Sequence, residues 1–199
     1  MISYSPKPEE IKALREETSA PMMDCRKALV DAAGDVERAK TLLLERGAAQ
    51  AEKKAQRTAD EGLVTSYIHA GGKIGVLVEV NSETDFVARN PKFAELSRDI
   101  AMHVAAMSPH YLDRASVPAE EVERLNEEFR AAVPSGKSPE VADKIVQGKL
   151  NKWYEENCLL DQAFVKDDSM SVGDLVNRSI GALGEKIRVR RFARYALGE

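Results

Sequence analysis

Few residues of this chain have both the type and the spacing that catalysis or metal binding requires. The run GGKI at positions 71–74 contains glycines and a lysine, as phosphate-binding loops do. Such a loop has the spacing G-x-x-x-x-G-K-[ST], whereas here an isoleucine follows the lysine. A hairpin turn is the favoured interpretation, because glycine readily takes turn conformations. His69, His103 and His110 lack the H-x-x-x-H and H-E-x-x-H spacings, so we expect surface or satisfied histidines and no metal site.

The acidic and sulfur-containing residues give no catalytic pattern either. Asp167 and Asp168 are adjacent, so their carboxylates point in different directions, and Ser169 beside them indicates a polar loop. Cys25 and Cys158 are far apart and outside any C-x-x-C pair, so we expect reduced, packed thiols. The sequence also lacks a G-x-S-x-G nucleophile motif. We therefore expect a protein that acts by binding, not an enzyme.

The basic run KIRVRRFARY at positions 186–195 is one candidate binding surface. Basic and aromatic side chains on a strand can hold phosphates and stack bases, which would suit a nucleic-acid-binding module. The alternative is a strand whose arginines pair with carboxylates and cover a sheet face. The net charge of −4 favours this alternative. A salt series on a heparin column would distinguish the two, because phosphate binding weakens steeply with ionic strength.

A second candidate is the stretch VNSETDFVARNP at positions 80–91. Turn and cap formers follow a run suited to a buried strand, so the chain is expected to leave the strand at Asn81. On pattern alone we favour a staple, in which Phe86 or Val87 packs beneath the first turn of the following helix. In the other interpretation, Phe86 is an exposed aromatic side chain on a rigid turn that fits a pocket on another protein.

The elements that must position these residues begin with three short helices. The first starts at Pro8 and is interrupted by TSAP at positions 18–21, and the second covers 22–33. The third starts after Gly34-Asp35 and is expected to end at Gly47. Together they predict a helical module over residues 1–50, followed at 51–61 by a helical linker without large apolar residues, outside any core.

The rest of the chain, residues 62–199, is expected to form an α+β core domain. Residues 63–69 and 74–80 predict an antiparallel hairpin, and Asn90-Pro91 predicts the start of a helix that runs to about Met107. Further expected elements are helices at 118–132, 138–158 and 171–183 and a third strand in IRVRRFARYAL at 187–197.

Composition narrows the class of protein. Of the 199 residues, 43% are hydrophobic and 31% charged, as in ordinary globular proteins. The sequence contains no apolar run long enough for a membrane span and no basic segment followed by an apolar one at the amino terminus. These features predict a cytoplasmic protein that does not bind membranes.

Several stretches resemble one family. GKIGVLVEVNSETDFVARN is similar to the most characteristic segment of elongation factor Ts, and LREETSAPMMDCRKALVDAAGDVERAKTLLLERG resembles that family's amino-terminal module, itself similar to ubiquitin-associated (UBA) domains. AMHVAAMSP, QAFVKDD and IRVRRFARYALGE resemble later segments in the same order. The resemblance covers residues 8–199. It implies a UBA-like three-helix module, a helical linker and a core of three antiparallel strands packed with helices.

The resemblance also implies a function and a set of contact residues. Members of the family promote release of GDP from elongation factor Tu, a regulatory binding activity that needs no cofactor. Thr84, Asp85 and Phe86 match a T-D-F tip that inserts beside the Mg²⁺ and phosphate site of the partner's G domain. Two further sets match contact positions: Arg15, Met22, Met23 and Lys54 for the same domain, and Ile74, Gly75 and His103 for the partner's C-terminal domain.

Some positions depart from the family pattern. Ser19 and Pro21 stand where members usually have glycines, and Ser82 replaces a frequent cysteine. The chain also has one core subdomain, whereas longer members have two. By resemblance to other short members, we expect a homodimer that supplies the second core, with no direct binding of nucleic acid.

Overall fold

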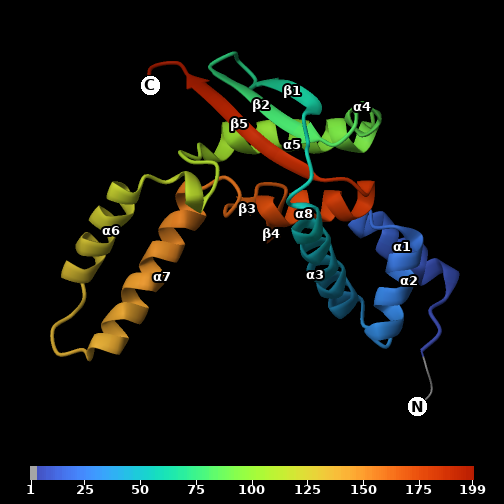
Figure 1. The fold of residues 1–199 in the computed structure, drawn as a ribbon, viewed down its shortest axis with the longest axis horizontal. Helices are drawn as coiled ribbons and strands as arrows, with labels where there is room; N and C mark the ends of the chain where they lie inside the picture. The colour runs from blue at the N-terminus through green and yellow to red at the C-terminus, as the bar shows by residue number, and fades with distance from the viewer. Residues whose placement is uncertain (1–3) are drawn as a thin grey trace.

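The computed structural model describes residues 4–199, so the first three residues of the expected 1–50 module lie outside it. The core is a three-stranded antiparallel sheet with helices on one face, which confirms the predicted α+β class (Figure 1). The helices are α1 (Pro8–Thr18), α2 (Met22–Asp31), α3 (Val36–Lys54), α4 (Asp85–Ala88), α5 (Pro91–Met107), η1 (Arg114–Ser116), α6 (Ala119–Ala131), α7 (Pro139–Asn157) and α8 (Val172–Leu183). The strands are β1 (Glu61–Ile68), β2 (Ile74–Ser82), β3 (Ala163–Phe164), β4 (Asp167–Ser171) and β5 (Ile187–Ala196).

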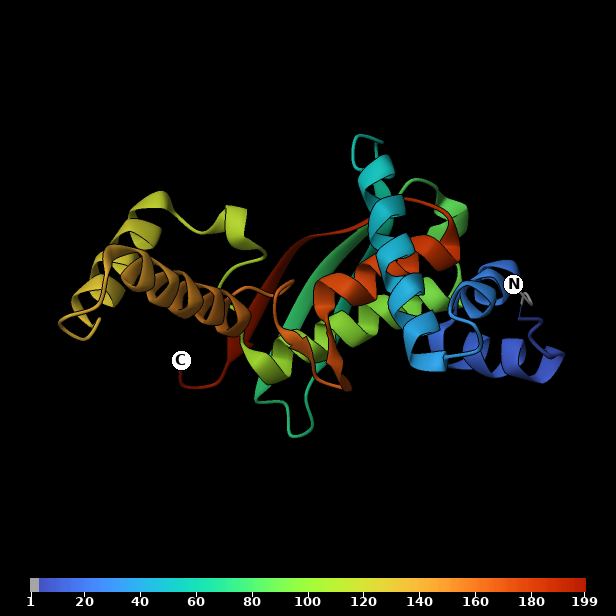
Figure 2. The same ribbon diagram turned by 90° about the horizontal axis from the view of Figure 1, so that it is seen from below.

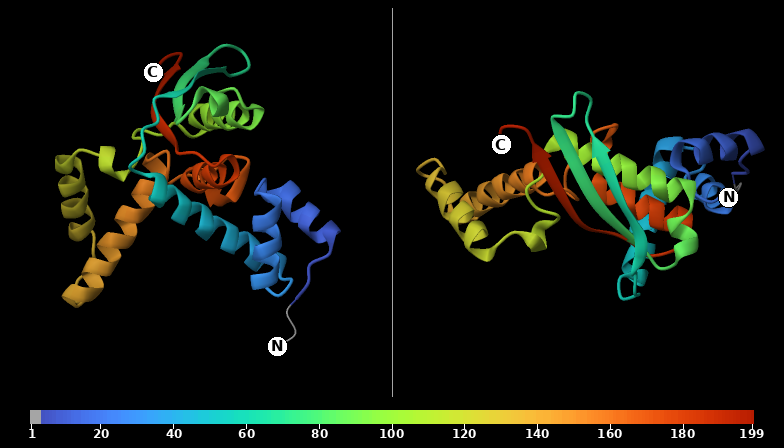
Figure 3. Two further views of the ribbon diagram at one scale, coloured as in Figure 1. Left: turned by 45° about the vertical axis from the view of Figure 1, so that its right-hand side comes forward. Right: turned by 90° about the horizontal axis from the view of Figure 1, so that it is seen from above.

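The sheet has the order β1-β2-β5, and α5 covers its inner face. Alternate residues of β2 point toward α5, and Val76, Val78 and Val80 are buried there against Phe93 and Ile100. This alternation explains why IGVLVEV forms a strand with one buried face. The other face of the sheet carries no helix (Figure 3).

The turn between β1 and β2 is the hairpin that the glycines predicted. Gly71 and Gly72 have φ values of 87° and 69°, which glycine adopts without steric cost. The Gly72 N–H donates to the carbonyl of His69 at 2.9 Å, and the His69 N–H donates to the carbonyl of Ile74 at 2.9 Å. The phosphate-loop interpretation is therefore excluded at this position.

Helices α1, α2 and the first half of α3 form the amino-terminal module. Its small core contains Leu14, Cys25 and Leu29, together with four buried alanines from α2, α3 and the loops that join the three helices. Ser19 ends α1 with a φ of 57°, a left-handed conformation that favours glycine, so a serine adopts it where the resemblance led us to expect glycine. Helix α2 ends two residues earlier than predicted because Ala33 takes a left-handed conformation.

The predicted end of the third helix at Gly47 is wrong. Helix α3 continues to Lys54 and so passes through the predicted boundary between residues 50 and 51. Gly47 is buried where α3 crosses α8, and a Cβ atom added there would lie 3.0 Å from the Asn177 carbonyl oxygen. The glycine serves close helix packing and not helix termination. Ala51 packs against the main core, so the expectation that this segment stays outside the core is also wrong.

Helices α6 and α7 form an arm at the opposite end of the molecule from the amino-terminal module (Figure 2). The arm has its own small core, with Leu125, Leu150 and Tyr154 buried and Phe129 and Trp153 packed against them. All three predicted helices after α5 are confirmed within one or two residues of their expected ends. The sequence did not predict α4, η1 or the short β3–β4 hairpin, which replaces the polar loop expected at residues 167–169.

Both cysteines are buried and free, as predicted. Burial raises the pKa of Cys158 to about 11, so its thiol stays protonated at neutral pH. Among the described residues, no helix has the length and apolar character needed to cross a membrane.

Replacing a helical glycine by leucine should lower the stability of the protein at the crossing of α3 over α8 and raise it elsewhere. Gly47→Leu should lower the free energy of unfolding by about 1–3 kcal/mol, because the new side chain meets the backbone of Asn177. Gly148→Leu is the matched control on α7, where a Cβ atom meets nothing within 4 Å. It should raise stability by about 0.5–1 kcal/mol through helix propensity. Urea unfolding of both variants measures the difference, and equal effects would contradict the close crossing.

Candidate functional site

The stretch at 80–91 stays in the sheet longer than predicted. Asn81 and Ser82 are buried and pair with Arg188 and Ile187 of β5, so the chain leaves the strand after Ser82 and not at Asn81. The pairing with a distant strand explains why two turn-forming residues remain extended. The Ser82 hydroxyl donates to the carbonyl of Thr84 at 3.0 Å and begins the turn.

Of the two neighbouring apolar residues in this turn, Val87 is buried and Phe86 is exposed. Thr84 caps the single-turn helix α4, accepting a hydrogen bond from the Val87 N–H at 3.4 Å. Val87 is 4% exposed and packs into the main core, so it supplies the contact expected of a staple. Phe86 is 79% exposed and points away from the core. Of the two residues named for the staple, Val87 therefore forms the buried contact, and Phe86 is exposed on the turn, as the other interpretation requires.

A carboxylate from the α8–β5 connection fixes this turn. The Thr84 hydroxyl donates to Glu185 Oε1 at 2.7 Å, and the Thr84 N–H donates to Glu185 Oε2 at 3.0 Å. Hydrogen bonds to an ionised carboxylate are stronger than those between neutral groups. Two such bonds on one residue restrain both the backbone and the side chain of Thr84, and so they orient the neighbouring Phe86.

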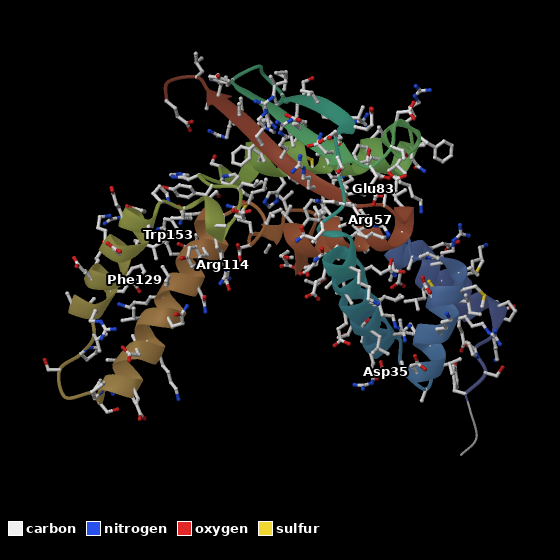
Figure 4. All side chains as sticks on the ribbon, viewed as in Figure 1. Asp35, Arg57, Glu83, Arg114, Phe129 and Trp153 are labelled. Atoms are coloured by element: carbon white, nitrogen blue, oxygen red, sulfur yellow. The ribbon has the colours of Figure 1, made fainter. Side chains whose placement is uncertain are left out.

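Glu83 makes a second connection to the same segment. Its Oε1 accepts a hydrogen bond from the Lys186 N–H at 2.6 Å, and its carboxylate lies 3.3 Å from the Arg57 guanidinium (Figure 4). The Lys186 N–H and the Arg57 charge lower the pKa of Glu83, although burial acts in the opposite direction. The Lys186 ammonium in turn donates to the carbonyls of Ala55 and Arg57 at 2.6 and 2.7 Å.

We call Arg57, Glu83, Glu185 and Lys186 the tip base, because their contacts tie the tip, Thr84 to Phe86, to the start of β1 and the start of β5. The sequence analysis missed Arg57, Glu83 and Glu185 as site residues. Their partners lie 26 to 103 residues away along the chain, so no local pattern marks them. The remaining tip residue, Asp85, pairs with Arg89 at 2.8 Å in an exposed ion pair that contributes little stability.

Helices α1 and α2, whose residues include Arg15, Met22 and Met23, lie at the same end of the molecule as α4 (Figures 1 and 2). Met22 and Met23 are 47% and 56% exposed, and Arg15 is also exposed on α1. Lys54 is half-buried at the end of α3. Burial and the nearby Arg57 charge lower the pKa of Lys54, while Glu83 and Glu185 oppose this effect. Lys54 thus lies beside the tip base.

The three residues predicted to face another domain of the partner do not share one face. Ile74 is half-buried on the inner side of the sheet, whereas Gly75 is on the uncovered side, with the Ile68 side chain over it. His103 is fully buried in α5, as expected of a satisfied histidine. Its Nδ1 accepts from the Val165 N–H at 3.2 Å and its Nε2–H donates to Gln162 at 3.0 Å.

Burial lowers the pKa of His103, while the hydrogen bond to Gln162 acts in the opposite direction. The imidazole is therefore neutral at pH 7 and has no exposed surface to offer a partner. Any contribution of His103 to binding passes through Val165, which it holds in place.

The basic run of β5 is largely paired within the chain. Arg190 and Arg191 both bind Glu79, at 2.9 and 2.7 Å, and Arg194 binds Glu199 at 2.6 Å. These pairs match the interpretation in which the arginines meet carboxylates. In the part of the chain that the structure describes, no three His, Cys, Asp or Glu side chains gather as a metal site would require. The exposed Phe86 on its restrained turn is suited to contact with another macromolecule.

Comparison with known proteins identifies the family. The family model described as "Elongation factor TS" matches residues 49–199. Proteins named elongation factor Ts are similar over nearly the whole chain: that of Koribacter versatilis is 54% identical over 191 residues, covering 96% of this chain and 87% of the relative. Those of Syntrophomonas wolfei and Caldanaerobacter subterraneus are 53% and 52% identical over 192 residues, covering 96% of this chain and 90% and 96% of the relatives. With a family model over most of its length and relatives of this similarity, the chain belongs to the elongation factor Ts family.

Proposed function

We propose that this protein is a guanine-nucleotide exchange factor for elongation factor Tu. It binds the GDP form of this G protein, promotes GDP release and is expelled by incoming GTP. Membership of the elongation factor Ts family supports the assignment. The structural observation that carries it is Phe86, 79% exposed on a turn that two bonds to Glu185 hold in place.

Phe86 acts as a wedge in this mechanism. The tip inserts beside the Mg²⁺ and phosphate site of the G domain and displaces the elements that hold the ion. Mg²⁺ requires near-octahedral geometry at about 2.0–2.1 Å, so small shifts of its ligands weaken its binding and that of GDP. Burying a phenylalanine contributes roughly 1.5–3 kcal/mol, enough to stabilise a displaced conformation of the partner. Asp85 brings a carboxylate whose ion pair with Arg89 is exposed and easily exchanged.

The amino-terminal region holds the same G domain. Arg15, Met22 and Met23 are exposed at the end of the molecule that carries the tip, and Lys54 lies beside the tip base. Methionine side chains adapt readily to an apolar surface. These contacts keep the G domain in place while the tip displaces its Mg²⁺ site.

The far end of the sheet contacts the partner's C-terminal domain through Ile74 on its inner side, while Gly75 lies beneath Ile68 on the face assigned to the dimer. This end lies one length of α5 from the tip, and 17 residues of helix span about 25 Å. His103 supports this end from within the core.

The exchange cycle follows from the thermodynamic linkage between nucleotide binding and factor binding. If the factor weakens GDP binding by some ratio, nucleotide weakens factor binding by the same ratio, so incoming GTP expels the factor. No bond is made or broken by this chain, so the protein is not an enzyme. It acts in the cytoplasm without binding nucleic acid directly, a reading supported by the net charge of −4 and by the pairing of Arg190 and Arg191 with Glu79.

The factor forms a homodimer through the uncovered face of the sheet. We call this the open face, formed by Val64, Ile68, Leu77 and Tyr195. These side chains are 69%, 65%, 50% and 75% exposed and come from all three strands. Four large, exposed apolar side chains on one face of a sheet indicate a protein interface. A second copy supplies the second core that longer members of the family contain.

Phe86→Ala should lower the maximal rate of GDP release by about ten- to a hundredfold, because the variant loses the buried wedge. The measurement is stopped-flow release of a fluorescent GDP analogue from elongation factor Tu at saturating factor. Val141→Ala removes an apolar side chain that is 41% exposed on the arm, away from the tip and from the far end of the sheet, and is the matched control. Equal acceleration by the parent and the Phe86 variant would remove Phe86 from the mechanism.

Glu185→Ala should lower the same maximal rate, because Thr84 loses both hydrogen bonds that orient the tip. Adding this change to Phe86→Ala should cause no further loss of rate, because the effect of Glu185 on the rate passes through the position of the Phe86 side chain, which the double variant lacks. A double-mutant cycle on the release rate measures this coupling. Fully additive effects would mean that Glu185 acts independently of Phe86.

Leu77→Lys should convert the dimer to a monomer, because it places a charge at the centre of the open face. Sedimentation velocity of the parent and the variant gives the oligomeric state directly. Val141→Lys changes a side chain that is 41% exposed on the arm and should leave the dimer intact. A monomeric parent, or a Leu77 variant that stays dimeric, would contradict the assigned interface.

A further inference from the structure

A pocket of about 470 Å³ lies where the amino-terminal module meets the core. Four parts of the chain line it: the end of α1 with the loop to α2, the stretch of α3 around Gly47, helix α8 and strand β4. Helix α3 runs from the module to α8, so the pocket joins the two units of the fold (Figure 1). Its volume is within the range of roughly 300–1,000 Å³ that small-molecule sites have in proteins.

Arg178 of α8 and Asp167 of β4 line this pocket close to each other without pairing. Burial lowers the pKa of Arg178, and the charge of Asp167 opposes this effect. The Ser169 hydroxyl lowers the pKa of Asp167, burial acts in the opposite direction, and the Arg178 charge adds to the lowering. Each group is thus near enough to act on the charge of the other. Even so, no hydrogen bond or ion pair joins Arg178 to any residue that the structure describes.

Both groups have hydrogen-bonding capacity left for a ligand. Asp167 accepts the Ser169 N–H and hydroxyl at 3.2 and 2.5 Å, both on Oδ1, and within the described part of the chain nothing donates to its Oδ2. A guanidinium fork suits a carboxylate, which accepts two parallel hydrogen bonds. A carboxylate oxygen suits a charged donor such as an ammonium group. A half-buried arginine without a direct partner is unfavourable, so a ligand that supplies one gains affinity.

The charges of the whole lining favour a ligand that carries both signs. The pocket holds four acidic and three basic side chains, so a phosphate or another multiply charged anion would meet repulsion there. Lys40 is already bound to Glu17 and Glu37, at 2.7 and 2.9 Å. Arg46 is bound to Asp31 through Nη2, while its Nη1 is buried without an acceptor among the residues that the structure describes. An anionic group with a cationic group beside it therefore suits this lining.

The rest of the lining is apolar. Ala20 and Pro21 come from the loop between α1 and α2, Leu43 and Leu44 from α3, and Met170 from β4. Both leucines and Met170 are half-buried, so part of each side chain is left uncovered by the protein. An aliphatic group placed there removes apolar surface from water.

We propose that this pocket binds a free α-amino acid with an apolar side chain, whose carboxylate is bound by Arg178 and whose ammonium group is bound by Asp167. In an α-amino acid the two charged groups are attached to one carbon atom, so the molecule bridges an arginine and a carboxylate that are close but unpaired. Its side chain packs against Leu44 and Met170. The ligand touches the module and the core at once and so stabilises their packing. The inference concerns the free factor and does not depend on the exchange function proposed above.

Isothermal titration calorimetry of the full chain with L-leucine measures this binding directly. Two analogues of leucine test the two charged contacts: isocaproate lacks the ammonium group, and isoamylamine lacks the carboxylate. Each analogue should bind at least about tenfold more weakly than leucine, because each loses one charge-assisted hydrogen-bonding group. Glycine should also bind more weakly, because it has no side chain to cover the apolar wall.

Variants test the two named residues. Arg178→Met removes the guanidinium, and Asp167→Asn removes the charge but keeps an oxygen for Ser169. Each should weaken leucine binding on the order of tenfold. Arg98→Met is the matched control, because Arg98 is exposed on α5 and does not line the pocket. This variant should bind leucine as the parent does.

Several results would overturn the inference. No binding of leucine by the parent, or equal binding of leucine, isocaproate and isoamylamine, would mean that the pocket does not recognise a zwitterion. Inorganic phosphate that binds and displaces leucine would indicate a simple anion site instead. Leucine binding that survives both Arg178→Met and Asp167→Asn would place the ligand elsewhere on the chain. The analogues are compared on the parent, so their result stands even if the Arg178 variant does not fold. Failure to accelerate GDP release would overturn the proposed function and leave this inference intact.

Discussion

Two hydrogen bonds from Thr84 to the Glu185 carboxylate join segments that lie 101 residues apart, and the exposed tip depends on them for its position. An aromatic side chain outside the core has no packing of its own to orient it. The tip base supplies that orientation from below, through Glu185 on one side and the Glu83 contacts to Lys186 and Arg57 on the other. The buried Val87 adds a third attachment. A large hydrophobic side chain is thereby held in water on a restrained turn.

The sequence predicted most of the elements because their signals are local. The alternation of IGVLVEV, the glycines of the hairpin turn and the Asn90-Pro91 start of α5 each describe a few neighbouring residues, and all are confirmed. The errors occur where a distant segment decides the outcome. The sequence alone indicates a helix end at Gly47, but α8 crosses α3 at this residue. It indicates a turn at Asn81 and Ser82, but both residues pair with β5.

In the candidate site, too, local signals were predictive and contacts between distant segments were not. Phe86 was identified as a possible contact residue from its place among turn formers, but its exposure depends on whether Phe86 or Val87 faces the core. That choice is set by the cap at Thr84 and by the base beneath it. Arg57, Glu83 and Glu185 could not be found in advance, because a carboxylate that serves a tip has no feature in sequence that separates it from the other acidic residues of the chain.

The sheet and α5 also relate the two ends of the molecule. The tip follows the end of β2 and Ile74 stands at its start, so one strand connects both ends. The main core lies between them, with Val78, Ile100 and Val104 fully buried. In the proposed complex, this rigid connection would fix the distance between the two contacts on elongation factor Tu.

The unbroken course of α3 has a consequence for how the amino-terminal module meets a partner. A flexible tether would let the module search a volume, and binding would then cost the conformational entropy of the tether. Here the helix continues past residue 50 and is packed against α8, so that cost is met during folding (Figure 3). In the proposed complex, the module and the tip then meet the G domain as one preorganised surface. A partner whose two sites have a different spacing would gain only one of these contacts, and this is a source of selectivity.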